Sequence, residues 1–281
     1  MCNGFAQTLS LGCEALMVHR QRPKLGQHFL ADARYCSRIA EALDLCTGDL
    51  LIEIGPGHGA VTGLLASRVR RLVAIELDSE LADELRQKFE ETPEVEIIQG
   101  DVLQTDIGEL CRRNGADRCY VVGNLPYYIT SPIIHHVLQF AAHVRAMGLL
   151  VQREVADRLT AQPGSRDYGY LTVFTRLYSS PRVVFQVPPG AFLPPPKVHS
   201  AFVRFDMRAG GPVVSSEDEE ELLRFLKQSF AYKRKKLLNC LSPVYSRPKV
   251  EQELARLGLS PGVRAEQLSL EQFVALFLSL R

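Results

Sequence analysis

The sequence predicts an α/β fold, with a mostly parallel β-sheet flanked by helices, followed by a small helical domain. Three observations predict it. Between residues 50 and 152, short β-rich runs alternate with amphipathic segments of the length that crossover helices need. The stretch Ala-Gly-Gly-Pro at 209–212 would end a strand and provide a linker. Beyond the linker, large apolar residues recur at four-residue spacing, which is typical of helices.

Size and composition exclude several classes of protein. The 281 residues suffice for one large domain with a smaller companion. Hydrophobic residues make up 46% and charged residues 23%, so disordered and fibrous classes are excluded. No apolar run reaches the roughly 18 to 20 residues of a membrane-spanning helix. The seven cysteines are odd in number and never stand as Cys-x-x-Cys, which favours reduced thiols. Since the positive flank of a secretory signal is also absent, we expect a cytoplasmic protein.

We expect three segments along the chain: a disordered extension at 1–16, a sheet-bearing catalytic domain at 17–208 and a helical domain at 209–281. The first segment is unlike the rest of the chain, and it precedes a basic stretch at 19–24. The net charge of +1 conceals an asymmetry. From Arg208 onward 12 Lys and Arg oppose 9 Asp and Glu, or +3, whereas residues 1–207 carry 21 against 23, or −2. The C-terminal part is therefore the basic one, although a charge run is often only a solvated surface.

Strands and helices are expected to alternate along the chain. Strands are predicted at 50–55, 72–77, 95–100, 120–124 and 148–152, with helices near 60–67, 79–90, 106–114 and 131–142 between them. Two further strands, at 182–187 and 201–207, flank a segment whose three consecutive prolines at 194–196 exclude a regular helix. In the C-terminal part, Ser216 and Glu219 fit a capping box. The apolar spacing that indicates helix there involves Leu222, Leu226, Phe230, Leu237 and Leu241.

A glycine-rich loop and two acids follow the first three strands. The loop runs from Glu53 to Gly59, and its glycines permit a tight turn and the close approach of a ligand. Ala60 stands where the dinucleotide fingerprint would have its third glycine, so the loop alone is a weak signal. Glu76 ends the next strand 21 residues after Gly55, near the offset at which an acid binds ribose hydroxyls. Asp101 follows the third strand, where it could accept a hydrogen bond from an adenine amino group. Together these features predict a nucleoside-like ligand.

The fourth strand ends in Asn124-Leu125-Pro126-Tyr127-Tyr128, which resembles the [N/D/S]-[P/L]-P-[Y/F/W] signature of methyltransferases that modify a planar amino group. The chain also contains Gln27-His28-Phe29-Leu30, the glycine loop, and FLPPPKVHSA from Phe192. In this order, the motifs resemble the S-adenosylmethionine-dependent rRNA adenine N6-dimethyltransferase family, closest to the bacterial small-subunit (16S) enzymes. The likeness runs from about Lys24 to the C-terminus. It implies a Rossmann-like class I methyltransferase fold with a seven-stranded sheet.

The resemblance implies roles for individual residues. S-adenosylmethionine would be bound by His28, Leu30, Gly55, Gly57, Glu76, Asp101 and Asn124; many relatives carry Asn at the first of these positions. The catalytic group would comprise Asn124, Leu125, Pro126, Tyr127 and Phe192. The Asn124 side-chain oxygen and the Leu125 carbonyl would accept the hydrogens of adenine N6 and turn its lone pair toward the methyl group. Tyr127 and Phe192 would stack on the target base, and no metal would be required.

An RNA partner implies phosphate contacts. The basic run at 233–236 stands beside Phe230 and Tyr232, and we expect it on a C-terminal helix, where it would contact the RNA backbone. The basic residues expected to bind RNA are Arg20, Arg22, Lys24, Lys197, Lys233, Arg234, Lys235 and Lys236. The implied partner is 16S rRNA in the immature small ribosomal subunit, bound by a monomer. The histidines show no spacing typical of metal ligands, so no metal is expected.

Three other functions remain open from the sequence. A large-subunit rRNA methyltransferase of the macrolide-resistance type shares the Asn124–Tyr127 signature. A ribosome-assembly factor could use the same fold to bind the immature small subunit without catalysis. An NAD-dependent dehydrogenase would account for the glycine loop, but for neither NLPYY nor FLPPPK.

Overall fold

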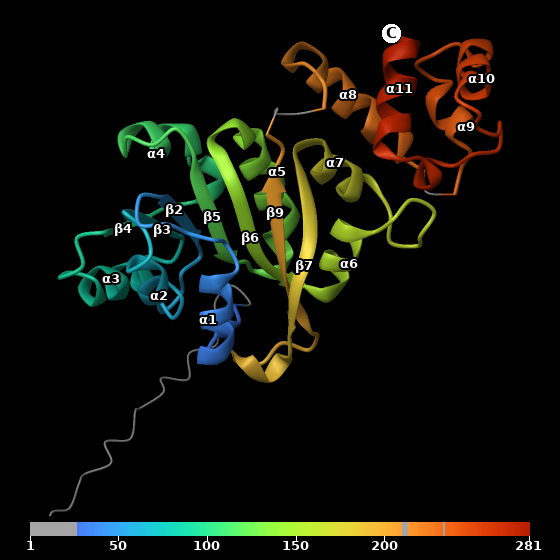
Figure 1. Ribbon diagram of the computed structural model, residues 1–281. Helices are drawn as coiled ribbons and strands as arrows, with labels where there is room; N and C mark the ends of the chain where they lie inside the picture. The colour runs from blue at the N-terminus through green and yellow to red at the C-terminus, as the bar shows by residue number, and fades with distance from the viewer. Residues whose placement is uncertain (1–26, 210–212, 233) are drawn as a thin grey trace, which may run out of the picture.

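The computed structural model describes residues 27–209, 213–232 and 234–281. Its centre is a seven-stranded sheet in the order β4-β3-β2-β5-β6-β9-β7 (Figure 1). The strands are β2 (Leu50–Ile54), β3 (Arg71–Glu76), β4 (Val95–Gln99), β5 (Cys119–Asn124), β6 (Val144–Gln152), β7 (Ser179–Val187) and β9 (Ser200–Met207). Strands β2 to β6 pair in parallel, whereas β9 is antiparallel to both β6 and β7. The predicted mostly parallel sheet is confirmed.

Helices cover both faces of the sheet, as the buried side chains of β2 show. Successive side chains of a strand point to opposite faces. Leu50 and Ile52 belong to the core formed with α5 and α7, whereas Leu51 belongs to the core formed with α1 and α2. The helices of this part are α1 (Ala33–Glu41), α2 (Thr62–Ala66), α3 (Ser79–Lys88), α4 (Ile107–Arg113), α5 (Thr130–Gln139), α6 (Arg153–Thr160) and α7 (Tyr170–Tyr178). Burial on both faces explains why these strands are nearly uninterrupted apolar runs.

A second, two-stranded sheet joins segments that are far apart in the sequence. Strand β1 (Phe29–Leu30) pairs antiparallel with β8 (Phe192–Leu193), with Leu30 opposite Phe192. Neither strand was predicted. Their pairing brings the His28–Leu30 segment against the proline-rich segment. Both segments lie near the carboxyl ends of β2 and β5, where the predicted site residues Gly55 and Asn124 stand.

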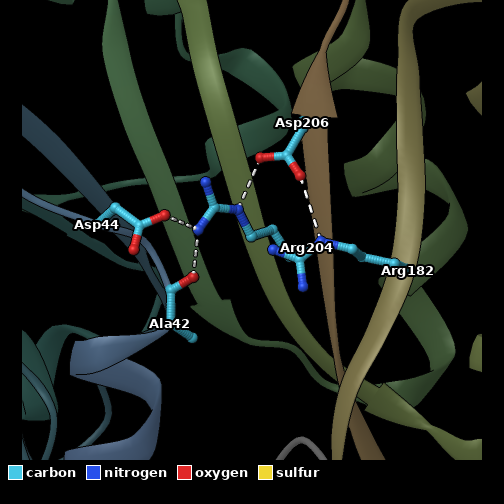
Figure 2. Close-up of polar contacts among 5 residues, drawn as sticks. All are labelled: Ala42, Asp44, Arg182, Arg204 and Asp206. Carbon is cyan, nitrogen blue, oxygen red and sulfur yellow. Dashed lines mark hydrogen bonds and ion pairs between the residues drawn. The ribbon is translucent and has the colours of Figure 1, made fainter.

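Arg204 on β9 connects α1 to the main sheet (Figure 2). Its guanidinium donates to the Ala42 carbonyl oxygen at 2.7 Å, directly after α1, and to the Asp44 carboxylate at 2.5 Å. It also donates to the Asp206 carboxylate at 2.7 Å, which accepts a further hydrogen bond from Arg182 at 3.4 Å. The Arg204 side chain is only 12% exposed. The end of α1 is therefore held to the antiparallel part of the sheet by a largely buried cation.

In the described part of the chain, four helices follow β9, and α8 and α11 pack against α7 (Figure 1). They are α8 (Ser216–Ser229), α9 (Leu237–Leu241), α10 (Arg247–Arg256) and α11 (Leu270–Leu280). Leu222 and Leu226 are buried in the same apolar cluster as β6 and α7. The Tyr178 hydroxyl at the end of α7 donates to the Glu219 carboxylate at 2.5 Å. The prediction of helices is confirmed, and the domain boundary at 209 stays a prediction. Short 3-10 helices lie at Val102–Gln104, Tyr127–Ile129, Ala141–His143, Pro189–Ala191 and Ala265–Gln267.

Two local predictions in the C-terminal part were wrong. Arg234, Lys235 and Lys236 lie in the loop between α8 and α9, with Lys236 capping α9, and not on a helix. The apolar spacing concealed the loop, because the seven-position offset from Phe230 to Leu237 also corresponds to two helical turns. The capping box was misplaced, because Ser215 stands at the N-cap of α8 and makes no side-chain capping bond.

Candidate active site

The carboxyl ends of β2 and β5 lie side by side in the middle of the sheet. Strands β3 and β4 extend from β2 in one direction, and β5 and β6 extend in the other, so the chain order reverses at this point. In open α/β sheets such a reversal is where ligands bind. Gly55 follows β2 with a φ of +66°, and a Cβ placed there would lie 3.6 Å from the Asn124 backbone oxygen. The fold thus brings two predicted site residues together at the expected ligand position.

A cavity of about 1260 Å³ opens at this position. It is lined by Leu30, by the glycine loop from Gly55 to His58 and by Asn124, with Leu193 and the following prolines on another side. Leu30, Gly55, Gly57 and Asn124 are the predicted cofactor residues that line it. His28, Glu76 and Asp101 are not among the lining residues that the structure describes. The cavity is large enough for a small-molecule cofactor together with part of a substrate.

Glu76 binds the glycine loop from the end of β3. The Glu76 carboxylate accepts hydrogen bonds from the backbone N–H groups of Gly57 at 3.2 Å and Asp78 at 3.1 Å. The side chain is buried, and burial raises its pKa although these hydrogen bonds oppose the effect. Gly57 has a φ of +57°, and a Cβ placed there would lie 2.7 Å from the Phe29 ring. Glu76 therefore holds a loop in which Gly57 permits both the turn and the close approach of β1.

Asn124 is fixed by a contact with the N-terminal segment. Its side-chain nitrogen donates to the His28 carbonyl oxygen at 3.0 Å, which leaves the side-chain oxygen as the remaining acceptor. The His28 ring lies 2.7 Å, through Nδ1, from the Pro194 carbonyl oxygen. Within the described residues, no backbone N–H donates to the Leu125 carbonyl oxygen. Two oxygens suited to accept hydrogens of an amine therefore stand at adjacent residues.

The two predicted stacking residues differ in exposure. Tyr127 is half-buried, its hydroxyl is 2.8 Å from the Ser200 hydroxyl, and burial raises its pKa. Its ring centre lies 5.6 Å from that of His28. Phe192 is 1% exposed and packs in the apolar cluster that contains Leu30. Pro126 precedes Tyr127 and accepts the N–H of Ile129 at 3.1 Å, which closes the short turn.

Asp101 caps the 3-10 helix that follows β4. Its carboxylate accepts the N–H of Leu103 at 2.9 Å, and its carbonyl oxygen accepts the Thr105 hydroxyl at 3.0 Å. These bonds fix the backbone after β4, beside the ends of β3 and β2 in the same sheet. Its predicted contact with an adenine amino group stays a prediction.

Glu53 is a site residue that was not predicted to have a role of its own. It lies in β2, lines the cavity, and is 4% exposed. Burial, assisted by the negative charge of Glu76, raises the pKa of Glu53 to about 7. Its Oε2 atom has no hydrogen-bond partner among the described residues. A carboxylate in the middle of the apolar run LLIEI was the available signal, because a charge in a strand buried on both faces needs a partner.

Four of the predicted RNA-binding residues can be located. Lys197 is exposed between β8 and β9, and Arg234, Lys235 and Lys236 are exposed in the loop before α9. The Lys235 ammonium lies 4.0 Å from the centre of the Tyr232 ring. The others, Arg20, Arg22, Lys24 and Lys233, lie outside the described residues, as does the predicted extension at 1–16.

The described residues form neither a metal-ligand cluster nor a membrane-spanning helix. No group of three or more His, Cys, Asp or Glu in the described ranges could hold a metal ion. Within the same ranges, none of the helices has the length and apolar character needed to cross a membrane.

The fold and the cavity define the class of protein: a Rossmann-like α/β enzyme whose ligand site lies where the strand order reverses, with a helical part after the last strand. The family described as "Ribosomal RNA adenine dimethylase" matches residues 18–281. The chain therefore belongs to the ribosomal RNA adenine dimethylase family, and it is an rRNA adenine dimethyltransferase.

Individual relatives agree with this assignment. The chain is 44% identical over 267 residues to Ribosomal RNA small subunit methyltransferase A of Acidobacterium capsulatum, covering 95% of this chain and 93% of the relative. It is 42% identical to the protein of the same name from Geobacter metallireducens, covering 92% and 94%. The structure of the 23S rRNA methyltransferase ErmE matches with a TM-score of 0.72 at 30% identity, covering 90% of this chain and 99% of that one. A dimethyladenosine transferase from Plasmodium falciparum matches with a TM-score of 0.76 at 24% identity, covering 89% and 96%, which supports the fold.

Proposed function

We propose that the enzyme transfers methyl groups from S-adenosylmethionine to N6 of two adjacent adenosines in 16S rRNA, giving N6,N6-dimethyladenosine. The small-subunit target is supported by the relatives at 42% and 44% identity, which are named for that subunit. ErmE, named for 23S rRNA, is 30% identical. The substrate would be the immature small subunit, met in the cytoplasm by a monomer.

The orientation of the Asn124 amide carries this proposal. Because its nitrogen donates to the His28 carbonyl, its oxygen is the group left to accept a hydrogen from N6. The Leu125 carbonyl oxygen, at the adjacent residue, would accept the other hydrogen. The N6 lone pair is delocalised into the adenine ring. Two acceptors would direct both N6 hydrogens away from the cofactor, so that the lone pair points toward the cofactor. The contribution of the protein is then mainly placement, which can supply roughly 7 to 11 kcal/mol.

The residues that line the cavity support S-adenosylmethionine as the cofactor. The glycine loop provides a surface without side chains at Gly55 and Gly57, and the Oε2 atom of Glu53 provides an unpartnered carboxylate oxygen for a cationic ligand. When bound, S-adenosylmethionine supplies an activated methyl group on a sulfonium. Leu30, Gly55, Gly57 and Asn124 would bind it directly. Glu76, Asp101 and His28 would complete the site from the strand ends and the N-terminal segment that border the cavity.

The target base must leave its stack to reach Asn124. Tyr127 would stack on one side of it, because its hydroxyl is already bound to Ser200 and its ring is half-buried. Phe192 would provide the other side. Since Phe192 is 1% exposed, this role requires the segment around β8 to move when RNA binds. Phosphates would be held by Lys197 and by the basic loop from Arg234 to Lys236.

Methyl transfer to isolated ribosomal subunits tests the proposal. With labelled S-adenosylmethionine, wild-type enzyme is expected to label unmodified small subunits, with dimethyladenosine detected by mass spectrometry, and to leave large subunits unlabelled. Labelling of large subunits alone would contradict the 16S assignment. Calorimetric titration with S-adenosylmethionine and with NAD tests the cofactor, and binding of NAD alone would reject it.

Asn124→Ala is the matched variant for the catalytic step. We expect it to lower kcat by about 100-fold or more, since removal of one preorganised hydrogen-bonding group from an active site has effects of that size. The unfolding free energy should fall by only about 1 kcal/mol, the worth of the lost bond to His28. Full dimethylation by this variant would contradict the role of the Asn124 oxygen.

A further inference from the structure

Tyr127 and Tyr128 are adjacent in the sequence but have opposite environments. Tyr127 is bound to Ser200 and lies against His28. Tyr128 is 63% exposed, and in the described part of the chain no side chain stacks against its ring or forms a hydrogen bond with its hydroxyl. A single exposed aromatic residue is common on protein surfaces. Tyr128, however, directly follows the candidate catalytic residues Asn124 to Tyr127, so its exposed ring is available to RNA bound at this site.

The backbone that carries Tyr128 is fixed from both sides. The Pro126 carbonyl oxygen accepts the N–H of Ile129 at 3.1 Å and the Thr130 hydroxyl at 3.4 Å. Thr130 is buried at the start of α5, followed by the buried side chains of Ile133 and Ile134. The exposed ring is therefore mounted on a rigid support. A tyrosine has few rotatable bonds, so ordering its ring on a ligand costs little conformational entropy.

The segment that begins at the end of β8 exposes apolar and basic side chains. Leu193 is 64% exposed, and Val198 and Lys197 are exposed in the same segment. Two contacts tie this segment to the residues around Asn124: Ser200 binds Tyr127, and the Pro194 carbonyl binds the His28 ring. An aromatic ring, aliphatic side chains and a lysine are thus exposed on two segments that border the site. Stacking surfaces combined with cations are the chemistry that binds single-stranded RNA.

We propose that Tyr128 stacks on the base next to the target adenosine, and that it favours a purine at that position. This inference rests on the proposed function. Tyr127 and Tyr128 are consecutive residues, and their Cα atoms are only about 3.8 Å apart. A base on Tyr128 would then belong to the nucleotide adjacent to the one beside Tyr127. With two adjacent adenosines, one occupies the pocket while Tyr128 holds the other at the entrance.

The test uses small subunits that lack the modification, either with both adenosines or with each one replaced in turn by uridine. Methylation of the remaining adenosine is measured as kcat/KM by mass spectrometry of nuclease digests. Wild-type enzyme should prefer the subunit with a purine neighbour. Tyr128→Ala should lower kcat/KM on the adenosine pair by about 5- to 150-fold, the range expected for loss of one stacked base, and should lose the preference for a purine. Tyr128→Phe, which keeps the ring, should behave as wild type.

Tyr232→Ala is the matched control, because Tyr232 is 55% exposed but lies in the basic loop before α9. It should lower kcat/KM equally on all three subunits. Calorimetry should give the same S-adenosylmethionine affinity for wild type and Tyr128→Ala, since Tyr128 does not line the cavity. An unchanged purine preference in Tyr128→Ala would overturn the inference while leaving the proposed function intact. Wild-type enzyme that labels no small subunit would instead reject the proposed function, and the inference with it.

Discussion

Glu53 is a carboxylic acid in the apolar strand β2, and its burial has a consequence for stability. Its pKa rises from 4.5 to about 7 because of desolvation. Between these values the folded state binds more protons than the unfolded state, so stability is fully present below pH 4.5 and is lost as pH rises through 7. The loss for an isolated group with this shift is at most about 3 kcal/mol.

Glu53→Gln is therefore expected to change the pH dependence of stability. Glutamine has nearly the same shape but does not ionise, so the variant should lose less stability than wild type between pH 5 and pH 8. Urea unfolding at several pH values, without cofactor, measures the difference. Glu41→Gln, at an exposed position, is the control and should follow the wild-type profile to within about 0.5 kcal/mol. Parallel profiles for wild type and Glu53→Gln would show that Glu53 is already ionised or solvated in the folded protein.

The sequence predicted individual residues where a motif dictates the backbone. Gly55 and Gly57 have the positive φ values that a tight loop requires, and Asn124 stands at the end of β5 as expected. Side-chain environments were not predictable in the same way. Nothing in the sequence distinguishes the bound ring of Tyr127 from the exposed ring of Tyr128, because the difference arises from Ser200 on a distant strand.

At the scale of elements, the position of α1 depends on β9. Helix α1 contributes Ile39 to the wall of the cavity, and the segment before it contributes Leu30 and Ala31. Arg204 fixes the other end of the helix through Ala42 and Asp44. The bond to the Ala42 carbonyl holds backbone, whereas Asp44 is largely exposed and its ion pair is weakened by solvent.

Arg204→Ala should therefore destabilise the protein by about 1.5 to 3 kcal/mol, the range for hydrogen bonds to charged groups. It should also weaken S-adenosylmethionine binding, since α1 borders the cavity. Arg182→Ala is a matched control: Arg182 is 55% exposed and contacts the same Asp206 carboxylate at 3.4 Å, so its loss should cost less than about 0.5 kcal/mol. Urea unfolding and calorimetry measure both effects. Equal stability of the two variants would mean that Arg204 does not anchor α1.

Long periodic elements were predictable and short ones were not. Strands β2 to β6 occur close to their predicted positions, and in β2, β3, β5 and β6 this is because burial on both faces requires nearly continuous apolar runs. Strands β1 and β8 contain two residues each, and they form only because Leu30 and Phe192 meet in the folded chain. The basic loop before α9 was mistaken for helix because the apolar residues on its two sides keep the same helical spacing. Spacing alone therefore does not show that one helix ends and another begins.

At the scale of the whole molecule, charge is separated along the chain. A net charge of +1 gives little overall attraction for RNA, so binding must depend on local groups of cations. The basic loop before α9 is one such group. It belongs to the helical part, which lies on the β7 side of the sheet (Figure 1). Helices α3 and α4 lie at the other end of the sheet, toward β4 (Figure 1). This separation predicts that removing cations from the two ends will have different effects on RNA binding.

The triple variant Arg234→Ala, Lys235→Ala, Lys236→Ala should weaken RNA binding and reduce the magnitude of the slope of log K against log salt by about 2.1 to 2.7, because each of three phosphate contacts contributes about 0.7 to 0.9. Its unfolding free energy should change little, since all three side chains are exposed. The control variant Arg86→Ala, Arg112→Ala, Arg113→Ala removes the same charge from α3 and α4, where these residues form surface ion pairs. If binding depended only on net charge, the two variants would lose affinity equally. A reduced salt slope in the loop variant alone, from titrations of small-subunit RNA at several salt concentrations, would locate the phosphate contacts on the helical part.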